Sequence, residues 1–309
     1  MKNLKIGLVL GGGGARGLAH IGVIKGLLKH NIPLHCVTGA SMGAIVGAAF
    51  CLLMDIEKVE QNFKHFIFSD KFVKLKGESV DLNSTEQPEG FFHYLTNIVK
   101  RRIVINLAIN RRGLVDSDRL ATAIQSLIPK VKIEHTHLPF ACSALNLVTG
   151  QEQIFIRGDL HSALLASSSV PGYLPPAKMD GHEFVDGAVI DSFPIEVCKE
   201  LGADFTIVCD VSPELETQSK FDNLIQVFIR SYRAVVKRLN NENLKKADFL
   251  IRPQLADRSW TDFEAIEFFI QQGEIAVEQN IDLLKEKIKG KSGWSYLIKK
   301  KFSPEKTRV

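Results

Sequence analysis

The sequence has 309 residues, of which 45% are apolar and 24% are charged, as in an average globular protein. This composition excludes a disordered, collagen-like or coiled-coil chain, and the length is sufficient for one large α/β domain. The longest uncharged apolar run, residues 43–54, is shorter than the roughly 20 residues that a membrane-spanning helix needs.

The net charge of +4 is concentrated at the C-terminal end. Residues 285–309 contain nine Lys or Arg and two Glu, a net charge of +7, so the rest of the chain carries −3. We therefore expect no nucleic-acid-binding core. The basic tail, residues 291–309, either contacts an anionic membrane surface or remains a solvated terminus.

The five cysteines are scattered and contain no C-x-x-C pair. This pattern predicts reduced, buried thiols, with neither a disulfide framework nor a metal site. The apolar run after the N-terminus, residues 6–10, is too short for a signal peptide. We expect a cytoplasmic protein, peripheral at most to the inner face of a membrane.

The first 54 residues predict alternating strands and helices. Apolar runs at residues 5–10 and 34–38 are typical of buried strands, and helical spacing follows each of them, over about 18–30 and 41–54. This alternation favours a parallel sheet covered on both faces.

The pattern loosens over residues 68–113, a variable and lid-like segment. Within it, apolar residues near 91–99 share one helical face, which fits either a lid or membrane-contact helix or an ordinary helix packed on the core. The remaining predicted elements are a helix capped by Asp116, a hairpin over 140–156, a helix over 160–167, a hairpin around Asp180-Gly181, a helix starting at Pro194, a strand over 204–210, and helices over 223–239 and 261–288.

These elements predict an α/β fold, a mostly parallel sheet sandwiched by helices, with a helical C-terminal extension. We expect a catalytic domain over residues 1–212, its helical extension over 213–290 and the basic tail over 291–309.

The segment Gly39-Ala40-Ser41-Met42-Gly43 matches G-x-S-x-G at a predicted strand-to-helix junction. A serine at such a turn has a strained backbone and projects its oxygen from the carboxyl edge of the sheet. The pattern indicates a nucleophile, and the alternative is a glycine-rich turn with an N-capping serine.

The segment Gly12-Gly13-Gly14-Ala15-Arg16-Gly17 matches G-x-G-x-x-G between a strand and a helix. A dinucleotide site requires an acid at the end of the next strand, and residues 34–38 contain none. The alternatives are an oxyanion hole, in which glycine amides face developing negative charge, or a simple tight turn.

A nucleophilic serine needs a base, and no histidine follows the late acids in the order that a Ser-Asp-His triad requires. His20, on the helix after the glycine loop, is expected to be a packed core residue. Asp186, in Val185-Asp186-Gly187-Ala188, leaves a predicted strand. It can serve as the base only if the site holds it beside Ser41 and raises its basicity; otherwise it is a turn residue.

These three motifs, in this order, resemble the signatures of the patatin-like phospholipase family, in its bacterial branch. The stretches 113–116 and 166–176 also resemble that family. The resemblance implies a Ser-Asp dyad with Ser41 as nucleophile and Asp186 as base. It also implies an oxyanion hole at Gly12, Gly13 and Gly14, supporting roles for Arg16, Gly17, Gly39, Gly43 and Gly187, no cofactor, and a lipid or acyl-ester substrate.

The chain departs from the family pattern at Leu165, where many bacterial relatives have Arg, and at Asn146, where they often have Asp. The leading prediction is a phospholipase A or lysophospholipase. The alternatives are a carboxylesterase, an inactive regulatory protein of the same fold, and a dinucleotide-binding enzyme.

Overall fold

The computed structural model describes residues 4–72, 112–113, 116–215, 217 and 219–292. The helix predicted near residues 91–99, most of the lid-like segment 68–113 and the basic tail from 293 onward lie outside the described residues.

The described strands form an eight-stranded sheet in the order β5-β6-β3-β2-β1-β7-β8, with β4 paired to β3. The pairings from β3 through β2, β1 and β7 to β8 are parallel, and those involving β4, β5 and β6 are antiparallel. Four of these seven pairings are parallel, so the prediction of a mostly parallel sheet is confirmed. The three antiparallel pairings make the sheet a mixed one. The strands are β1 (Ile6–Leu10), β2 (Leu34–Gly39), β3 (Phe140–Asn146), β4 (Gln151–Phe155), β5 (Ala177–Met179), β6 (His182–Asp186), β7 (Phe205–Cys209) and β8 (Phe249–Ile251).

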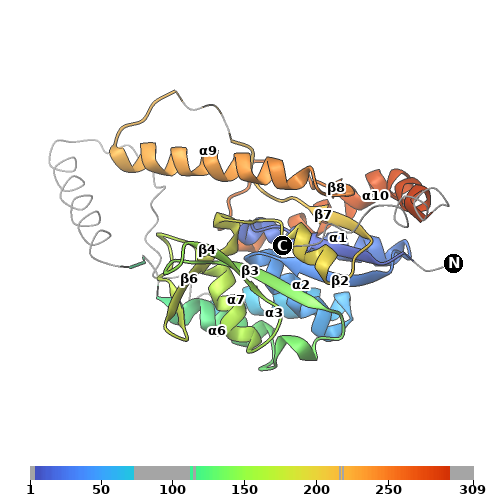
Figure 1. Cartoon of the computed structure of the whole chain (residues 1–309), viewed down its shortest axis with the longest axis horizontal. Coiled ribbons are helices and arrows are strands. Elements are labelled where there is room, and N and C mark those ends of the chain that lie inside the picture. The colour runs from blue at the N-terminus through green and yellow to red at the C-terminus, as the bar shows by residue number, and fades with distance from the viewer. Residues whose placement is uncertain (1–3, 73–111, 114–115, 216, 218, 293–309) are drawn as a thin grey trace, which may run out of the picture.

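Helices lie on both sides of this sheet (Figure 1). They are α1 (Ala19–Lys29), α2 (Met42–Leu53), α3 (Ile56–Ile67), α6 (Ser117–Leu127), α7 (Leu160–Ser168), α8 (Ile195–Glu200), α9 (Leu224–Leu244) and α10 (Ile266–Ser292). Short 3-10 turns occur at Gly14–Leu18, Ile133–His135, Gly187–Val189 and Phe263–Ala265. No helix in the described ranges combines the length and apolar content needed to cross a bilayer.

Two elements go beyond the sequence prediction. Helix α3 begins after Asp55, whose side chain accepts the N–H of Lys58, and β8 is a three-residue strand too short for a periodic signal. The prediction for Pro194 is off by one position, because this residue is the N-cap and α8 begins at Ile195. The cap at Asp116 is confirmed.

Alternate residues of the central strands face two separate cores. Leu8 and Leu10 join the larger core, which includes α1, α2, α3 and α10. Val9 faces the opposite side, where it packs with α8 and with Leu244 at the end of α9. Burial on both faces explains why the central strands are continuous apolar runs.

Helices α1 and α10 pack with their backbones in close approach. A side chain on Gly22 would collide with the carbonyl of Ile270, and one on Gly273 would collide with the carbonyl of Ala19. The C-terminal helix is thus part of the core formed by the first strands and helices.

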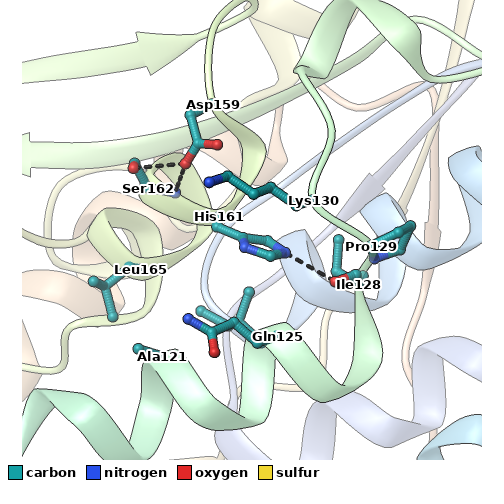
Figure 2. Close-up of a pocket in the computed structure, with 10 residues that line it drawn as sticks. Ala121, Gln125, Ile128, Pro129, Lys130, Asp159, His161, Ser162 and Leu165 are labelled. Atoms are coloured by element: carbon teal, nitrogen blue, oxygen red, sulfur yellow. Dashed lines mark hydrogen bonds between the residues drawn. The ribbon is translucent and has the colours of Figure 1, made fainter.

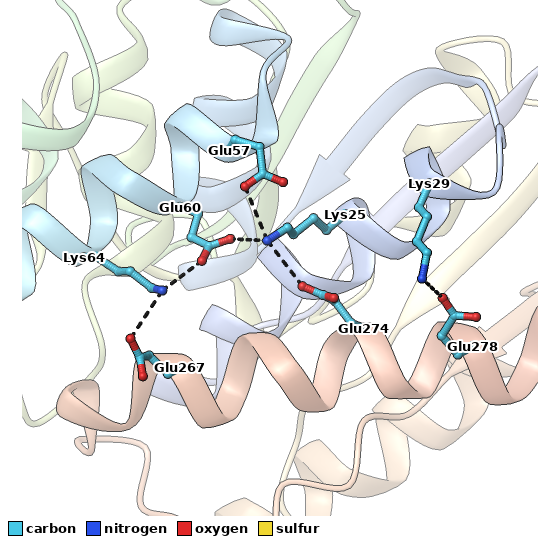
Figure 3. A network of polar contacts seen from close by, with 8 residues as sticks. All are labelled: Lys25, Lys29, Glu57, Glu60, Lys64, Glu267, Glu274 and Glu278. Carbon is cyan, nitrogen blue, oxygen red and sulfur yellow. Dashed lines mark hydrogen bonds and ion pairs between the residues drawn. The ribbon is translucent and has the colours of Figure 1, made fainter.

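Ion pairs join α1, α3 and α10 at the edge of this contact (Figure 3). The Nζ of Lys25 lies 2.7 Å from Glu60, 3.4 Å from Glu57 and 3.4 Å from Glu274. Lys64 bridges Glu60 on α3 to Glu267 on α10. Lys25 therefore holds α3 and α10 against α1, and Lys64 joins α3 to α10.

Candidate active site

The two glycine motifs leave the sheet side by side. Strands β1 and β2 are parallel neighbours, with Leu10 paired to Gly39, so both chains emerge at the same carboxyl edge. The N–H of Ala40 donates to the carbonyl of Leu10, 3.2 Å away. A Cβ placed on Gly12 would lie 3.3 Å from the Cβ of Ser41. The glycine loop therefore passes directly beside the serine.

Ser41 occupies the strained turn that its motif predicts. Its φ of 54° and ψ of −129° lie outside the regions that residues with a side chain normally adopt. Ser41 is also the N-cap of α2, at the positive end of the helix dipole. Gly43 is required for space, because a Cβ there would collide with the carbonyl of Leu10, and Gly39 packs against Gly43 in turn.

Asp186 reaches Ser41 because β2 and β6 meet end to end. Gly39 of β2 pairs with Cys142 of β3, and Asp186 of β6 pairs with Ala144. Strand β4 occupies the other edge of β3 at both positions, so β2 and β6 share one edge and run toward each other. Their carboxyl ends meet near residue 143, and this brings the side chain of Ser41 close enough to the Asp186 carboxyl to act on its pKa.

The C-terminal end of α7 fixes the backbones of both residues. The N–H of Ser41 donates to the carbonyl and to the Oγ of Ser167, each at 3.1 Å. The N–H of Asp186 donates to the carbonyl of Ser169, 2.9 Å away. The last carbonyls of a helix lack partners within the helix. Here the backbone N–H groups of the two candidate catalytic residues donate to these carbonyls. Sequence reasoning assigned no role to these serines, although the run Ser167-Ser168-Ser169 was the signal available.

Burial gives the Asp186 carboxyl an unusual basicity. The side chain is buried, and this burial raises the pKa to about 6, while the nearby Ser41 side chain and a hydrogen bond from the N–H of Ala188, at 2.8 Å, oppose the rise. A carboxylate with this pKa is still ionised at neutral pH, and it accepts a proton more readily than an exposed aspartate does. Gly187 follows it with its Cα against the carbonyl of Ser143.

The glycine loop has amides available near Ser41. The N–H of Gly11 donates to Cys209 and that of Ala15 to Trp260, whereas those of Gly12 and Gly13 donate to no backbone carbonyl of the described residues. Gly14 adopts a φ of +56°, and the chain then enters a 3-10 turn. Amides without a partner at such a position can bind an oxyanion.

His20 lies behind the loop, where its Nε2 donates to the carbonyl of Gly11 at 2.8 Å. Burial lowers the pKa of this imidazole to about 4, despite that hydrogen bond. The ring is therefore neutral at physiological pH. Its contact is with the loop backbone, and the hydrogen bond to the Asp186 carboxylate comes from the N–H of Ala188.

The Arg16 side chain joins the glycine loop to distant chain segments. Its Nε donates to the carbonyl of Val211 at 2.9 Å, and its Nη1 donates to those of Ala256 and Arg258. Gly17 sits under Met42 at the start of α2. Both residues support the loop from outside.

The two departures from the family pattern lie outside the Ser41–Asp186 contact. Asn146 accepts the N–H groups of Val148 and Thr149, and its Nδ2 lies 3.1 Å from Nδ1 of His182. It therefore holds the β3–β4 turn. Leu165 is a partly buried residue of α7 that packs on the larger core and on a small apolar cluster formed by Ala144, Ala166, Ala177 and Phe184.

A cavity of about 530 Å³ opens between α6 and α7 (Figure 2). Its polar wall includes Lys130, His161, and Asp159 hydrogen-bonded to Ser162. None of the motif residues lines it. Within the described ranges, no group of three or more His, Cys, Asp or Glu side chains is placed to hold a metal ion, and all five cysteines are free and buried.

Comparison with known proteins finds relatives that match about two thirds of the chain. The chain is 27% identical over 210 residues to an uncharacterised NTE family protein of Mycobacterium bovis, which covers 67% of this chain and 49% of that protein. It is 30% identical over 214 residues to the neuropathy target esterase of Drosophila melanogaster, which covers 69% of this chain and 13% of the esterase. The chain thus spans about half the length of the mycobacterial relative and much less of the animal one.

Among solved structures, VipD from Legionella pneumophila superposes with a TM-score of 0.49 and 16% identity, covering 91% of this chain and 67% of VipD. A family model described as patatin-like phospholipase matches residues 8–199, which include every motif residue named above. That match extends over more than half of the sequence, and it shows that the chain belongs to the patatin-like phospholipase family.

Proposed function

We propose that this protein is a lipid acyl hydrolase of the phospholipase A or lysophospholipase type, with Ser41 as nucleophile and Asp186 as base. The observation that carries the proposal is the end-to-end meeting of β2 and β6, which brings the buried Asp186 carboxyl next to Ser41, a serine on a strained strand-to-helix turn. Family membership supports an ester of a lipid as substrate. Relatives named neuropathy target esterase and lysophospholipase support the same class.

In the first half of the proposed reaction, the Oγ of Ser41 attacks the ester carbonyl carbon while its proton passes to the Asp186 carboxylate. The amides of Gly12, Gly13 and Gly14 and the N-terminus of α2 stabilise the negative charge that develops on the carbonyl oxygen. When the tetrahedral species collapses, the carbon–oxygen bond to the alcohol breaks. Asp186 then protonates the departing alcohol oxygen.

In the second half, water attacks the acyl-serine carbonyl and transfers a proton to Asp186. Collapse releases the fatty acid, and the proton returns to the Oγ of Ser41. Asp186 thus acts as base and acid in turn, which suits a pKa raised by burial to about 6.

The test is labelling with a fluorophosphonate probe together with hydrolysis of a panel of phospholipids, lysophospholipids and short soluble esters. We expect the wild-type protein to be labelled and to hydrolyse the lipids. We expect Ser41→Ala to lose labelling and at least about 10³-fold in turnover, because the nucleophile is missing. Circular dichroism should show the variant folded.

Ser162→Ala is a matched control, since its hydroxyl pairs with Asp159 in the first turn of α7 and should leave activity unchanged. Unlabelled wild-type protein would indicate an inactive protein of the same fold. Hydrolysis confined to short soluble esters would indicate a carboxylesterase. Turnover by Ser41→Ala above about a tenth of the wild-type value would remove Ser41 from the mechanism.

A further inference from the structure

Helix α9 exposes an unusual amount of apolar surface. Leu224, Phe228 and Val235 are 82%, 72% and 60% exposed, and Leu239 is also exposed. At 100° per residue these four positions fall within one narrow stripe along the helix. A continuous apolar stripe of this length on a protein surface marks a contact site.

The attachment of α9 leaves this stripe accessible. The helix is held at its C-terminal end, where Leu244 and Asn240 are buried and the Nδ2 of Asn243 donates to Asp191 at 2.9 Å. In the preceding part of the helix no described side chain is buried. Figure 1 shows α9 as a long rod along the outer side of the molecule.

The C-terminal end of α9 is joined to the segment that follows Asp186. Asp191, its partner in the hydrogen bond with Asn243, lies five positions after Asp186. Partial burial raises the pKa of Tyr232, in the middle of α9, to about 12, and the negative charge of Asp186 adds to this rise. The apolar stripe is therefore on a helix whose C-terminal end is held against the segment that follows Asp186.

The charge of α9 indicates what covers the stripe. The helix contains Arg230, Arg233, Lys237 and Arg238 but a single acid, Glu242, a net charge of +3 in a chain whose first 284 residues carry −3. A second copy of α9 would bring like charges together. An anionic bilayer complements both the charge and the apolar stripe, as in interfacial helices with one apolar and one basic face.

We propose that α9 is an interfacial helix that docks on anionic phospholipid bilayers through Leu224, Phe228, Val235 and Leu239, placing the candidate active site against the lipid surface. The proposed function explains what the docking would achieve, since lipid esters would enter the active site from the bilayer, and the proposal rests on it in this respect alone. Docking itself needs no catalysis. It can therefore be measured in protein that carries Ser41→Ala.

The experiment measures partition of full-length Ser41→Ala protein onto phosphatidylcholine vesicles with and without phosphatidylglycerol. We expect binding that requires phosphatidylglycerol. Adding Phe228→Ser and Val235→Ser should lower the partition coefficient at least about tenfold, because two apolar groups no longer enter the bilayer. Adding Arg233→Gln and Arg238→Gln should lower it by about fivefold for each charge.

The matched control is the pair Ile275→Ser and Leu283→Ser, which removes exposed apolar groups from α10 instead. It should change partition by less than about twofold. Undiminished vesicle binding by the Phe228→Ser, Val235→Ser protein would overturn the proposal. The proposal would also be overturned if, without lipid, the Ser41→Ala protein sedimented as a dimer and the protein with Phe228→Ser and Val235→Ser added sedimented as a monomer. That result would identify a second copy of the chain as the partner of the stripe.

A lower melting temperature of the α9 variant without lipid would also overturn the proposal, since it would show that the stripe is covered within the chain. We expect no change in sedimentation or melting temperature. If wild-type protein binds vesicles through α9 but hydrolyses no ester, the docking surface stands and the proposed function fails. If wild-type protein hydrolyses lipids but the α9 variants bind vesicles as well as wild type does, the proposed function stands and the docking proposal fails.

Discussion

At the scale of single residues, the candidate site depends on the Asp186 carboxylate, whose ionised form is destabilised when the protein folds. Burial raises the pKa of Asp186 to about 6, whereas an aspartate in an unfolded chain has a pKa of about 3.9. The folded protein therefore binds this proton more tightly than the unfolded chain does. The resulting stability cost is fully present above pH 6 and disappears as the pH falls toward about 4.

The raised pKa of Asp186 also predicts how the reaction rate depends on pH. Because the base must be ionised, kcat/KM should fall about tenfold per pH unit below an apparent pKa near 6. The measurement is a pH–rate profile on a short soluble ester, which avoids changes in lipid charge. A profile that stays flat down to about pH 4.5 would argue that Asp186 is not the base.

Asp186→Asn should separate activity from stability. The variant keeps the shape and the hydrogen bond from Ala188 but loses the proton acceptor, so activity should drop about 10²-fold or more. Because a buried charge is removed, the free energy of unfolding at pH 7.5 should rise by about 1–3 kcal/mol. Denaturant titration and kinetics on one preparation test both parts, and normal turnover or a marked loss of stability would contradict the assignment.

His20→Gln should leave most activity intact. The imidazole is neutral, and its Nε2 donates to Gly11, a contact that a glutamine amide can also make. We expect kcat/KM within about tenfold of wild type and a stability loss of about 1 kcal/mol. A drop as large as that of Ser41→Ala in a folded variant would instead require a histidine-dependent mechanism.

At the scale of elements, the ion pairs of Lys25 join three helices. Burial alone would raise the pKa of Glu60, and hydrogen bonds from Lys25 and Lys64 bring it below the usual value. A lowered pKa in the folded state stabilises the fold at neutral pH, and this contribution disappears as the pH falls through that pKa. Without Lys25, the carboxylates of Glu57, Glu60 and Glu274 would repel one another.

We expect Lys25→Met to lower the free energy of unfolding at pH 7 by about 1–2 kcal/mol, and less in high salt because screening weakens the repulsion. Lys29→Met is the matched control, since Lys29 on the same helix is more exposed and pairs with Glu278. Its effect should be much smaller, because an exposed ion pair contributes little to stability. Equal effects of the two variants in urea titrations would show that the wider network adds nothing.

At the scale of the whole molecule, the C-terminal part supports the site. The family match ends at residue 199, yet Arg16 in the glycine loop donates to the carbonyls of Ala256 and Arg258. Helix α10 covers α1, and β8 pairs with β7. We therefore propose that the segment beyond residue 212 is part of the catalytic domain.

Truncation after residue 212 should consequently abolish folding. The fragment would expose the face of α1 that packs on α10 and would leave the buried Arg16 guanidinium with one of its three carbonyl partners, at a cost of several kcal/mol. The measurement is circular dichroism and size-exclusion chromatography of the fragment beside the full-length chain. A folded fragment with esterase activity would place the domain boundary near 212 instead.

The sequence by itself determined the local elements that lead into the site. Gly39 to Gly43 specify a tight strand-to-helix turn, Asp116 specifies a cap, and the apolar runs at 5–10 and 204–210 specify buried strands, because each depends on neighbours a few residues away. The same locality let the sequence argue against a dinucleotide site, since the required acid would lie at a fixed spacing.

Only the tertiary structure decided which distant groups meet. That Asp186 faces Ser41 follows from the end-to-end meeting of β2 and β6 along β3. The role of Ser167 and Ser169 likewise depends on where α7 ends against both chains. The basicity of Asp186 and the exposure of Phe228 depend on what packs around each side chain, and no local pattern encodes burial by segments more than a hundred residues away.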